Sequence, residues 1–218
     1  MEDQDVRRAR TDRAVLNYFG QLRMYSYVDL LLLFGAVRSG IIHAVLASLL
    51  WFGFLIHLEW RHRDRGRALW PWYMWAVPWL LVVLLWHDLT VLIFLACACF
   101  YSLKKRFRPI AAVSPVLNGA LKAMLILGAS VTAGMLALVF VLTAIRNLLG
   151  DVRDAAKDAR EGVRSIPVLL GYVGSNRYVY PAGLITTSVV WTLVGEIPIY
   201  WLAAAIVVQA ATYRLTPR

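Results

Sequence analysis

Residues 131–171 read VTAGMLALVFVLTAIRNLLGDVRDAAKDAREGVRSIPVLLG, and the two halves of this stretch differ sharply in polarity. The first half, 131–149, is almost entirely apolar. It approaches the roughly 20 residues that a helix needs to cross the hydrocarbon core of a bilayer. The second half, 150–171, carries closely spaced acidic and basic residues. The stretch therefore predicts a membrane helix that leads directly into a charged segment.

The composition of the whole chain also favours a membrane protein. Of the 218 residues, 60% are hydrophobic and 17% are charged, whereas a soluble domain is nearer half apolar and a quarter charged. Such high hydrophobicity excludes an intrinsically disordered chain. With only two cysteines, the chain is not a disulfide scaffold either.

The apolar blocks predict one all-α domain, a polytopic membrane bundle of about eight transmembrane helices. This transmembrane domain covers residues 25–213 and follows a basic N-terminal segment, residues 1–24. Several spans are shorter than the bilayer requires of a straight helix. The expected spans are 25–37, 41–58, 70–86, 89–103, 113–128, 131–149, 178–195 and 198–213.

The charged residues lie in alternate connections between these spans. The net charge is +10, and the basic residues cluster in the N-terminal segment and in loops near 59–69, 103–112 and 150–177. Every second loop is therefore basic, as the positive-inside rule requires of cytoplasmic loops. We expect a multi-pass protein of the cell membrane with both termini in the cytoplasm, and no nucleic-acid partner.

Three aspartates follow the apolar half of the opening stretch. Asp151, Asp154 and Asp158 are spaced i, i+3 and i+7, so a helix places them on one face. Mg²⁺ is commonly held by one or two carboxylates together with substrate phosphates. The alternative interpretation is a solvated amphipathic helix stabilised by pairs with neighbouring basic residues, and the spacing alone leaves both open.

The same segment resembles the second aspartate-rich motif of the UbiA superfamily of intramembrane prenyltransferases, most closely in its archaeal ether-lipid and chlorophyll-synthase branches. A second match resembles the Tyr–Pro–x–x–Lys–Arg loop that follows the fourth helix of the family. The matching positions are Arg146, Asp151, Asp154, Asp158, Gly162, Ser165, Ile166, Pro167, Val168 and Gly171 in the motif, and Tyr101, Lys104, Lys105, Arg106 and Pro115 near the loop.

The first aspartate-rich motif of the family, N–D–x2–D–x3–D, is degenerate in this chain. Its expected place after the second span holds IHLEWRHRD, residues 56–64. Glu59 and Asp64 are the acidic residues there, and they are the candidates for a second group of metal ligands.

The resemblance implies a prenyl diphosphate bound with its apolar tail between helices and its diphosphate at the cytoplasmic mouth. Asp151, Asp154 and Asp158 would act in catalysis by holding Mg²⁺, and the prenyl group would pass to a polar or aromatic acceptor. The candidate diphosphate-binding residues are Lys104, Arg106, Arg146, Arg164, Asn118 and Lys122.

Two other functions remain open at this point. A terpene cyclase of the same superfamily would ionise the diphosphate and quench the cation internally. A non-catalytic membrane protein could keep a cleft for lipid or diphosphate after losing the first motif. The sequence defines neither the acceptor nor the prenyl chain length nor the oligomeric state.

Overall fold

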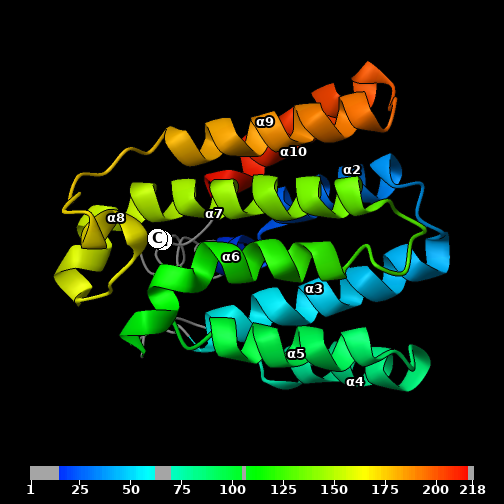
Figure 1. The fold of residues 1–218 in the computed structure, drawn as a ribbon, viewed down its shortest axis with the longest axis horizontal. Helices are drawn as coiled ribbons and strands as arrows, with labels where there is room; N and C mark the ends of the chain where they lie inside the picture. The colour runs from blue at the N-terminus through cyan, green and yellow to red at the C-terminus, as the bar shows by residue number, and fades with distance from the viewer. Residues whose placement is uncertain (1–14, 62–69, 105–106, 216–218) are drawn as a thin grey trace, which may run out of the picture.

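The computed structural model describes residues 15–61, 70–104 and 107–215. The described residues are helical and contain no strand, which confirms the expected all-α class for this part of the chain. Figure 1 shows the bundle that the helices form. The helices are α2 (Met24–Ala36), α3 (Ile41–Arg61), α4 (Tyr73–Leu85), α5 (Leu89–Tyr101), α6 (Arg108–Met124), α7 (Ala133–Glu161), α8 (Ile166–Leu169), α9 (Val179–Val194) and α10 (Ile199–Tyr213).

Successive long helices run in alternate directions along the bundle (Figure 1). Helix α7 packs against both α6 and α9, while α5, α4 and α3 follow one another beyond α6. Helices α2 and α10 pack against each other and against α9. Because of this alternation, the connections after α2, α4, α6 and α9 lie at one end, and the C-terminal end of α7 lies with α8 at the other (Figure 1).

Each expected span coincides with a helix, but three boundaries differ from the sequence-based prediction. Helix α3 continues to Arg61 and α7 continues to Glu161, so the first part of the expected 150–177 loop is helical. Helix α6 begins at Arg108 rather than near 113. Proline near its start explains this, since the fixed φ of Pro109 suits the first turn of a helix.

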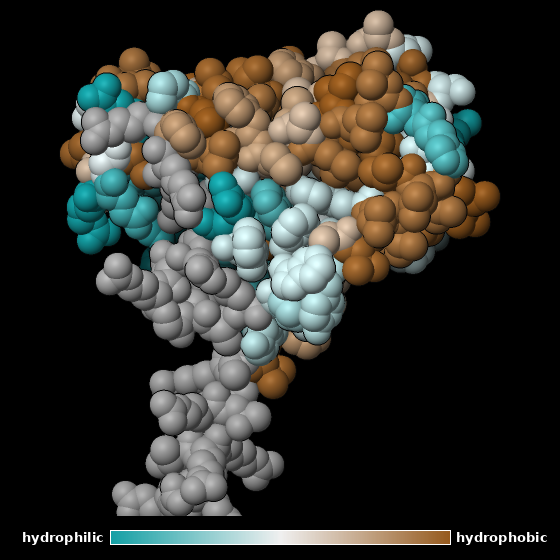
Figure 2. Space-filling view, turned by 90° about the horizontal axis from the view of Figure 1, so that it is seen from below, coloured by the Kyte–Doolittle hydropathy of each residue, from teal (hydrophilic) through white to brown (hydrophobic). Residues whose placement is uncertain are grey.

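Only α3 and α7 are long and apolar enough to cross a membrane, judged by length and composition in the described part of the chain. Helices α4, α5, α9 and α10 are apolar but shorter. Large apolar side chains nevertheless lie exposed on these helices, for example Leu80 at 58% and Val207 at 68%. Figure 2 shows apolar surface over most of the face in view, with hydrophilic residues gathered mainly toward the end where α7 finishes. Such a continuous apolar surface needs a lipid or protein environment.

Candidate functional site

The three aspartates of the acidic motif lie on the final turns of α7, at the polar end of the bundle (Figure 1). Gly162 ends α7 in the left-handed conformation, with φ 71°. A glycine adopts this conformation without the steric penalty of a side chain. Ser165 then precedes the short helix α8, which carries Pro167 in its first turn. The Gly–x–x–Ser–Ile–Pro part of the motif is thus a helix stop followed by a helix start.

Asp151 is the most buried of the three carboxylates, with only 5% of its surface exposed. Its Oδ1 lies 3.9 Å from the Lys104 Nζ, and its Oδ2 accepts a 3.4 Å hydrogen bond from the Ser114 hydroxyl. Burial raises the pKa of Asp151 to about 6; the ammonium of Lys104 lowers it, and the carboxylates of Asp158 and Asp154 raise it further. Asp151 is thus a buried carboxylate whose contacts with Lys104 and Ser114 are both long.

A row of polar side chains continues from Asp151 into the space between α5, α6 and α7. The Tyr101 hydroxyl accepts hydrogen bonds from Asn147 at 3.0 Å, from Lys104 at 3.4 Å and from Asn118 at 3.5 Å. We call Tyr101, Lys104, Ser114, Asn118, Asn147 and Asp151 the polar row.

Sequence reasoning missed Ser114 and Asn147 as members of the polar row. Ser114 lies four residues before Asn118, and Asn147 lies four residues before Asp151, so each shares a helix face with a residue that was selected. This i,i+4 relation was the signal that could have found them.

Asp154 differs from Asp151 in having a close cationic partner. The Arg153 guanidinium donates two hydrogen bonds to it, 2.7 Å from Nε and 2.5 Å from Nη2. Arg153 also donates a 3.0 Å hydrogen bond to the Tyr213 hydroxyl and lies over the ring of Tyr180. The alternative interpretation, pairing with a neighbouring basic residue, therefore applies to Asp154, because a side chain as long as arginine reaches its sequence neighbour.

The motif fits a metal shared with substrate better than a site built from protein alone. Among residues 15–61, 70–104 and 107–215, no three or more His, Cys, Asp or Glu side chains converge as a metal cluster. Asp151 and Asp158 remain on one helix face, while Asp154 is held by Arg153. Mg²⁺ can use one or two protein carboxylates and complete its shell with water and phosphate oxygens. Asp151 and Asp158 lie about 10.5 Å apart along the helix, so each carboxylate suits its own phosphate-bound Mg²⁺.

The degenerate first motif contributes little to this end of the bundle. Glu59 is buried and accepts a 3.0 Å hydrogen bond from the Arg23 Nε, so its carboxylate has a strong basic partner. His57 is buried among the rings of Trp60, Trp75 and Trp79. Asp64 and Arg106 lie outside the described residues.

Two of the candidate diphosphate-binding residues, Lys122 and Arg146, pair with the carboxylate of Asp29 inside the bundle. The Asp29 Oδ2 lies 2.6 Å from the Arg146 Nη1 and 3.2 Å from the Lys122 Nζ. The Asp29 Oδ1 accepts hydrogen bonds from Thr187 at 2.9 Å and from Trp191 at 3.0 Å. We call Asp29, Lys122 and Arg146 the buried ion cluster.

The candidate diphosphate-binding residues therefore do not all lie together in the structure. Asn118 and Lys122 share a face of α6, yet Asn118 belongs to the polar row and Lys122 to the buried ion cluster. Arg164 is exposed in the turn between α7 and α8, at the same end as Asp151. The structure therefore gathers Lys104, Asn118 and the acidic motif, and leaves Lys122 and Arg146 deeper in the bundle.

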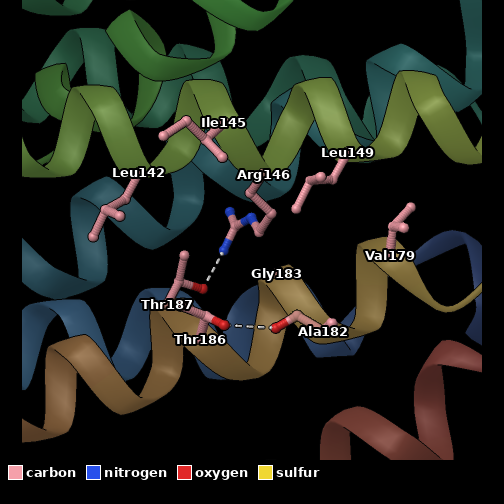
Figure 3. Close-up of a pocket in the computed structure, with 9 residues that line it drawn as sticks. All are labelled: Leu142, Ile145, Arg146, Leu149, Val179, Ala182, Gly183, Thr186 and Thr187. Atoms are coloured by element: carbon pink, nitrogen blue, oxygen red, sulfur yellow. Dashed lines mark hydrogen bonds between the residues drawn. The ribbon is translucent and has the colours of Figure 1, made fainter.

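A cavity of about 290 Å³ lies between α7 and α9 (Figure 3). Its lining is mainly apolar and includes Leu142, Leu149 and Val179. The Arg146 guanidinium points across it toward Thr187, whose hydroxyl accepts a 3.1 Å hydrogen bond from Nη1. The apolar cavity therefore reaches the buried ion cluster, because Arg146 belongs to both.

The polar end contains the buried carboxylate of Asp151 and the carboxylate of Asp158 on the same face of α7. It also contains the cationic side chains of Lys104 and Arg164, which come from two other segments. Such a set can bind a cation together with a polyanion.

No family model, curated protein or solved structure matches the chain.

Proposed function

We propose that this protein is an intramembrane, Mg²⁺-dependent prenyltransferase that transfers a prenyl group from a prenyl diphosphate to a polar or aromatic acceptor. The observation that carries the proposal is Asp151, a buried carboxylate beside Lys104 at the polar end of a long apolar helix. It lies within a stretch that resembles the second aspartate-rich motif of the UbiA superfamily. A carboxylate is kept in such a site at a cost in stability, which favours a functional role.

We further propose that the bundle spans the membrane about eight times, with its polar end in the cytoplasm of the cell. Exposed apolar side chains along the helices support a lipid environment. The alternate direction of the helices brings the basic connections to one end, in agreement with the positive-inside rule (Figure 1). The short helices α4 and α5 would require a locally thinned bilayer, as short spans do in general.

In the proposed site, Asp151 and Asp158 would each hold a cation, and the two cations would neutralise charge on the diphosphate. Lys104 and Arg164 would donate hydrogen bonds to phosphate oxygens, and the position of both residues at the polar end supports this role. The bond between the allylic carbon and the diphosphate oxygen breaks, and the electron pair leaves with the diphosphate. The acceptor then forms the new bond to the allylic carbon and loses a proton.

A second candidate function is a non-catalytic membrane protein that binds a lipid or diphosphate. The ion pairs of Asp154 with Arg153 and of Glu59 with Arg23 favour it, because both occupy carboxylates that the family motifs would give to metal. A terpene cyclase shares the first chemical step of the transferase, and the products distinguish the two.

The test uses the full chain purified in nanodiscs. Pyrophosphate release is followed from geranyl, farnesyl and geranylgeranyl diphosphates, with and without Mg²⁺ and with and without added lipid extract. The proposal predicts release that requires Mg²⁺ and an acceptor from the extract. Asp151→Asn is expected to reduce the rate at least about 100-fold, the size of effect seen when a group that stabilises developing charge is lost.

Ser175→Ala is the matched control, since it removes a polar group from the same end without touching the aspartates. Release without an acceptor, with a hydrocarbon product, would identify a cyclase. No release from any of the three diphosphates would favour the binding protein.

A further inference from the structure

The polar residues that line the cavity between α7 and α9 are Arg146, Thr186 and Thr187, and among them only Arg146 is charged. Leu142, Ile145 and Leu149 line the cavity from α7, and the side chain of Leu149 packs closely against Gly183 of α9 (Figure 3). Arg146 also lines the cavity although only 5% of its surface is exposed. A hydrocarbon chain fits such a lining, and its end would meet the guanidinium.

The buried ion cluster carries an excess of positive charge. Asp29 supplies one negative charge, whereas Lys122 and Arg146 supply two positive charges, and all three side chains are almost completely inside the bundle. The Lys122 Nζ has no hydrogen-bond partner in the described structure beyond its ion pair, and it lies 4.4 Å from the centre of the Trp51 ring. An uncompensated charge is costly in such surroundings, so the cluster favours an additional anion.

The Arg146 guanidinium has donors left for that anion. Its Nη1 is used by Asp29 and Thr187. Within the described part of the chain, no hydrogen bond is found for its Nε or Nη2. These two donors form the side of the guanidinium that pairs with both oxygens of a carboxylate.

We propose that this groove binds a long-chain monocarboxylate, with its carboxylate on Arg146 and its hydrocarbon chain between α7 and α9. One negative charge balances the excess of the buried ion cluster, whereas a diphosphate would bring more charge than the cluster can neutralise. The cavity volume of about 290 Å³ is near the lower limit of small-molecule pockets, which suits a single narrow chain. Arg146 lies five residues before Asp151, about 7.5 Å along the helix, so this site is separate from the acidic motif.

The probe is dodecanoate, added to the full chain in detergent and detected as a mass adduct by native mass spectrometry. Neither Mg²⁺ nor a prenyl diphosphate is present, so the result is independent of the proposed function. Dodecanol is the uncharged control ligand. Leu142→Phe fills the groove, and Val141→Phe introduces the same side chain at a neighbouring position that does not line it. Arg146→Lys retains the charge but removes the paired donors.

We expect a saturable one-to-one adduct with dodecanoate and none with dodecanol. Leu142→Phe and Arg146→Lys should each weaken the binding at least about tenfold, equivalent to 1.4 kcal/mol, while Val141→Phe should leave it unchanged. Equal binding of dodecanol would overturn the proposal, as would equal effects of the two phenylalanine variants or the absence of any adduct. The thermal stability of each variant shows whether it is folded.

Discussion

The fold shifts the pKa values of two aspartates of the acidic motif, Asp151 and Asp154, in opposite directions. Burial raises the pKa of Asp151 to about 6, so folding disfavours its ionised form. Burial also opposes ionisation of Asp154, but the hydrogen bonds from Arg153 outweigh it and lower the pKa of Asp154. Asp151 is thus a carboxylate whose ionisation the fold opposes, whereas Asp154 has a stabilising partner in place.

This contrast predicts opposite effects of the two asparagine substitutions on stability without Mg²⁺. The cost of ionised Asp151 appears as the pH rises from 3.8 through about 6. Asp151→Asn should therefore stabilise the protein by about 1–3 kcal/mol at pH 7.5 and by less than about 1 kcal/mol at pH 4. Asp154→Asn should destabilise it modestly at pH 7.5, with the loss shrinking as the pH falls. Thermal denaturation in detergent at both pH values measures this, and destabilisation by Asp151→Asn at pH 7.5 would contradict it.

Lys104 tunes the protonation of Asp151. Its ammonium lies 3.9 Å from the carboxylate and lowers the pKa that burial has raised. Lys104→Met should therefore raise the pKa of Asp151 further. The acidic limb of the Mg²⁺-dependent rate, normalised to its maximum, should move to higher pH, because Asp151 must be ionised to hold the cation. Lys104→Arg should leave the limb in place, and an unshifted limb in Lys104→Met would show that the ion pair has no effect.

At the scale of the element, α7 joins an apolar span to the acidic motif in one continuous helix. Its end depends on Gly162, which has φ 71° and open space where a side chain would be. Gly162→Ala should therefore lower stability by about 1 kcal/mol, from backbone conformation alone. Gly40→Ala is the matched control, because Gly40 also has open space but is not among the residues with positive φ. Equal melting temperatures for the two variants would contradict this role of Gly162.

The elements were predictable from the sequence to different degrees. The apolar blocks located the long helices, because their hydrophobicity is a property of each segment alone. The extension of α7 to Glu161 was missed as a boundary, since charged residues can continue a helix when a pair such as Lys157–Glu161 supports it. The spacing did place Asp151 and Asp158 on one face of a helix.

Contacts between elements were beyond the reach of spacing. The structure pairs Asp29 with Lys122 and Arg146, although the three residues lie far apart in the sequence. These residues lie on α2, α6 and α7, and no local pattern specifies which helices meet. The tertiary arrangement also decides that Asn118 joins Tyr101 instead of the buried ion cluster.

For the whole molecule, the distribution of charge between the two ends predicts the orientation in the membrane. Val173 lies in the exposed segment after α8, and Gly40 lies at the opposite end of the bundle. After Cys97 and Cys99 are replaced by alanine, Gly40→Cys should react with a membrane-impermeant maleimide on intact cells. Val173→Cys should react only after permeabilisation. Labelling of both positions on intact cells would contradict the proposed topology.

The central claim is that the acidic motif binds a divalent cation together with a prenyl diphosphate. The most direct measurement is electron paramagnetic resonance of Mn²⁺, used in place of Mg²⁺, with the purified protein and farnesyl thiodiphosphate, which resists cleavage. We predict that protein and ligand together immobilise Mn²⁺ more tightly than the ligand alone, and that Asp151→Asn and Asp158→Asn each reduce this gain while Ser175→Ala retains it. Equal Mn²⁺ binding by the wild-type protein and both aspartate variants would contradict the claim.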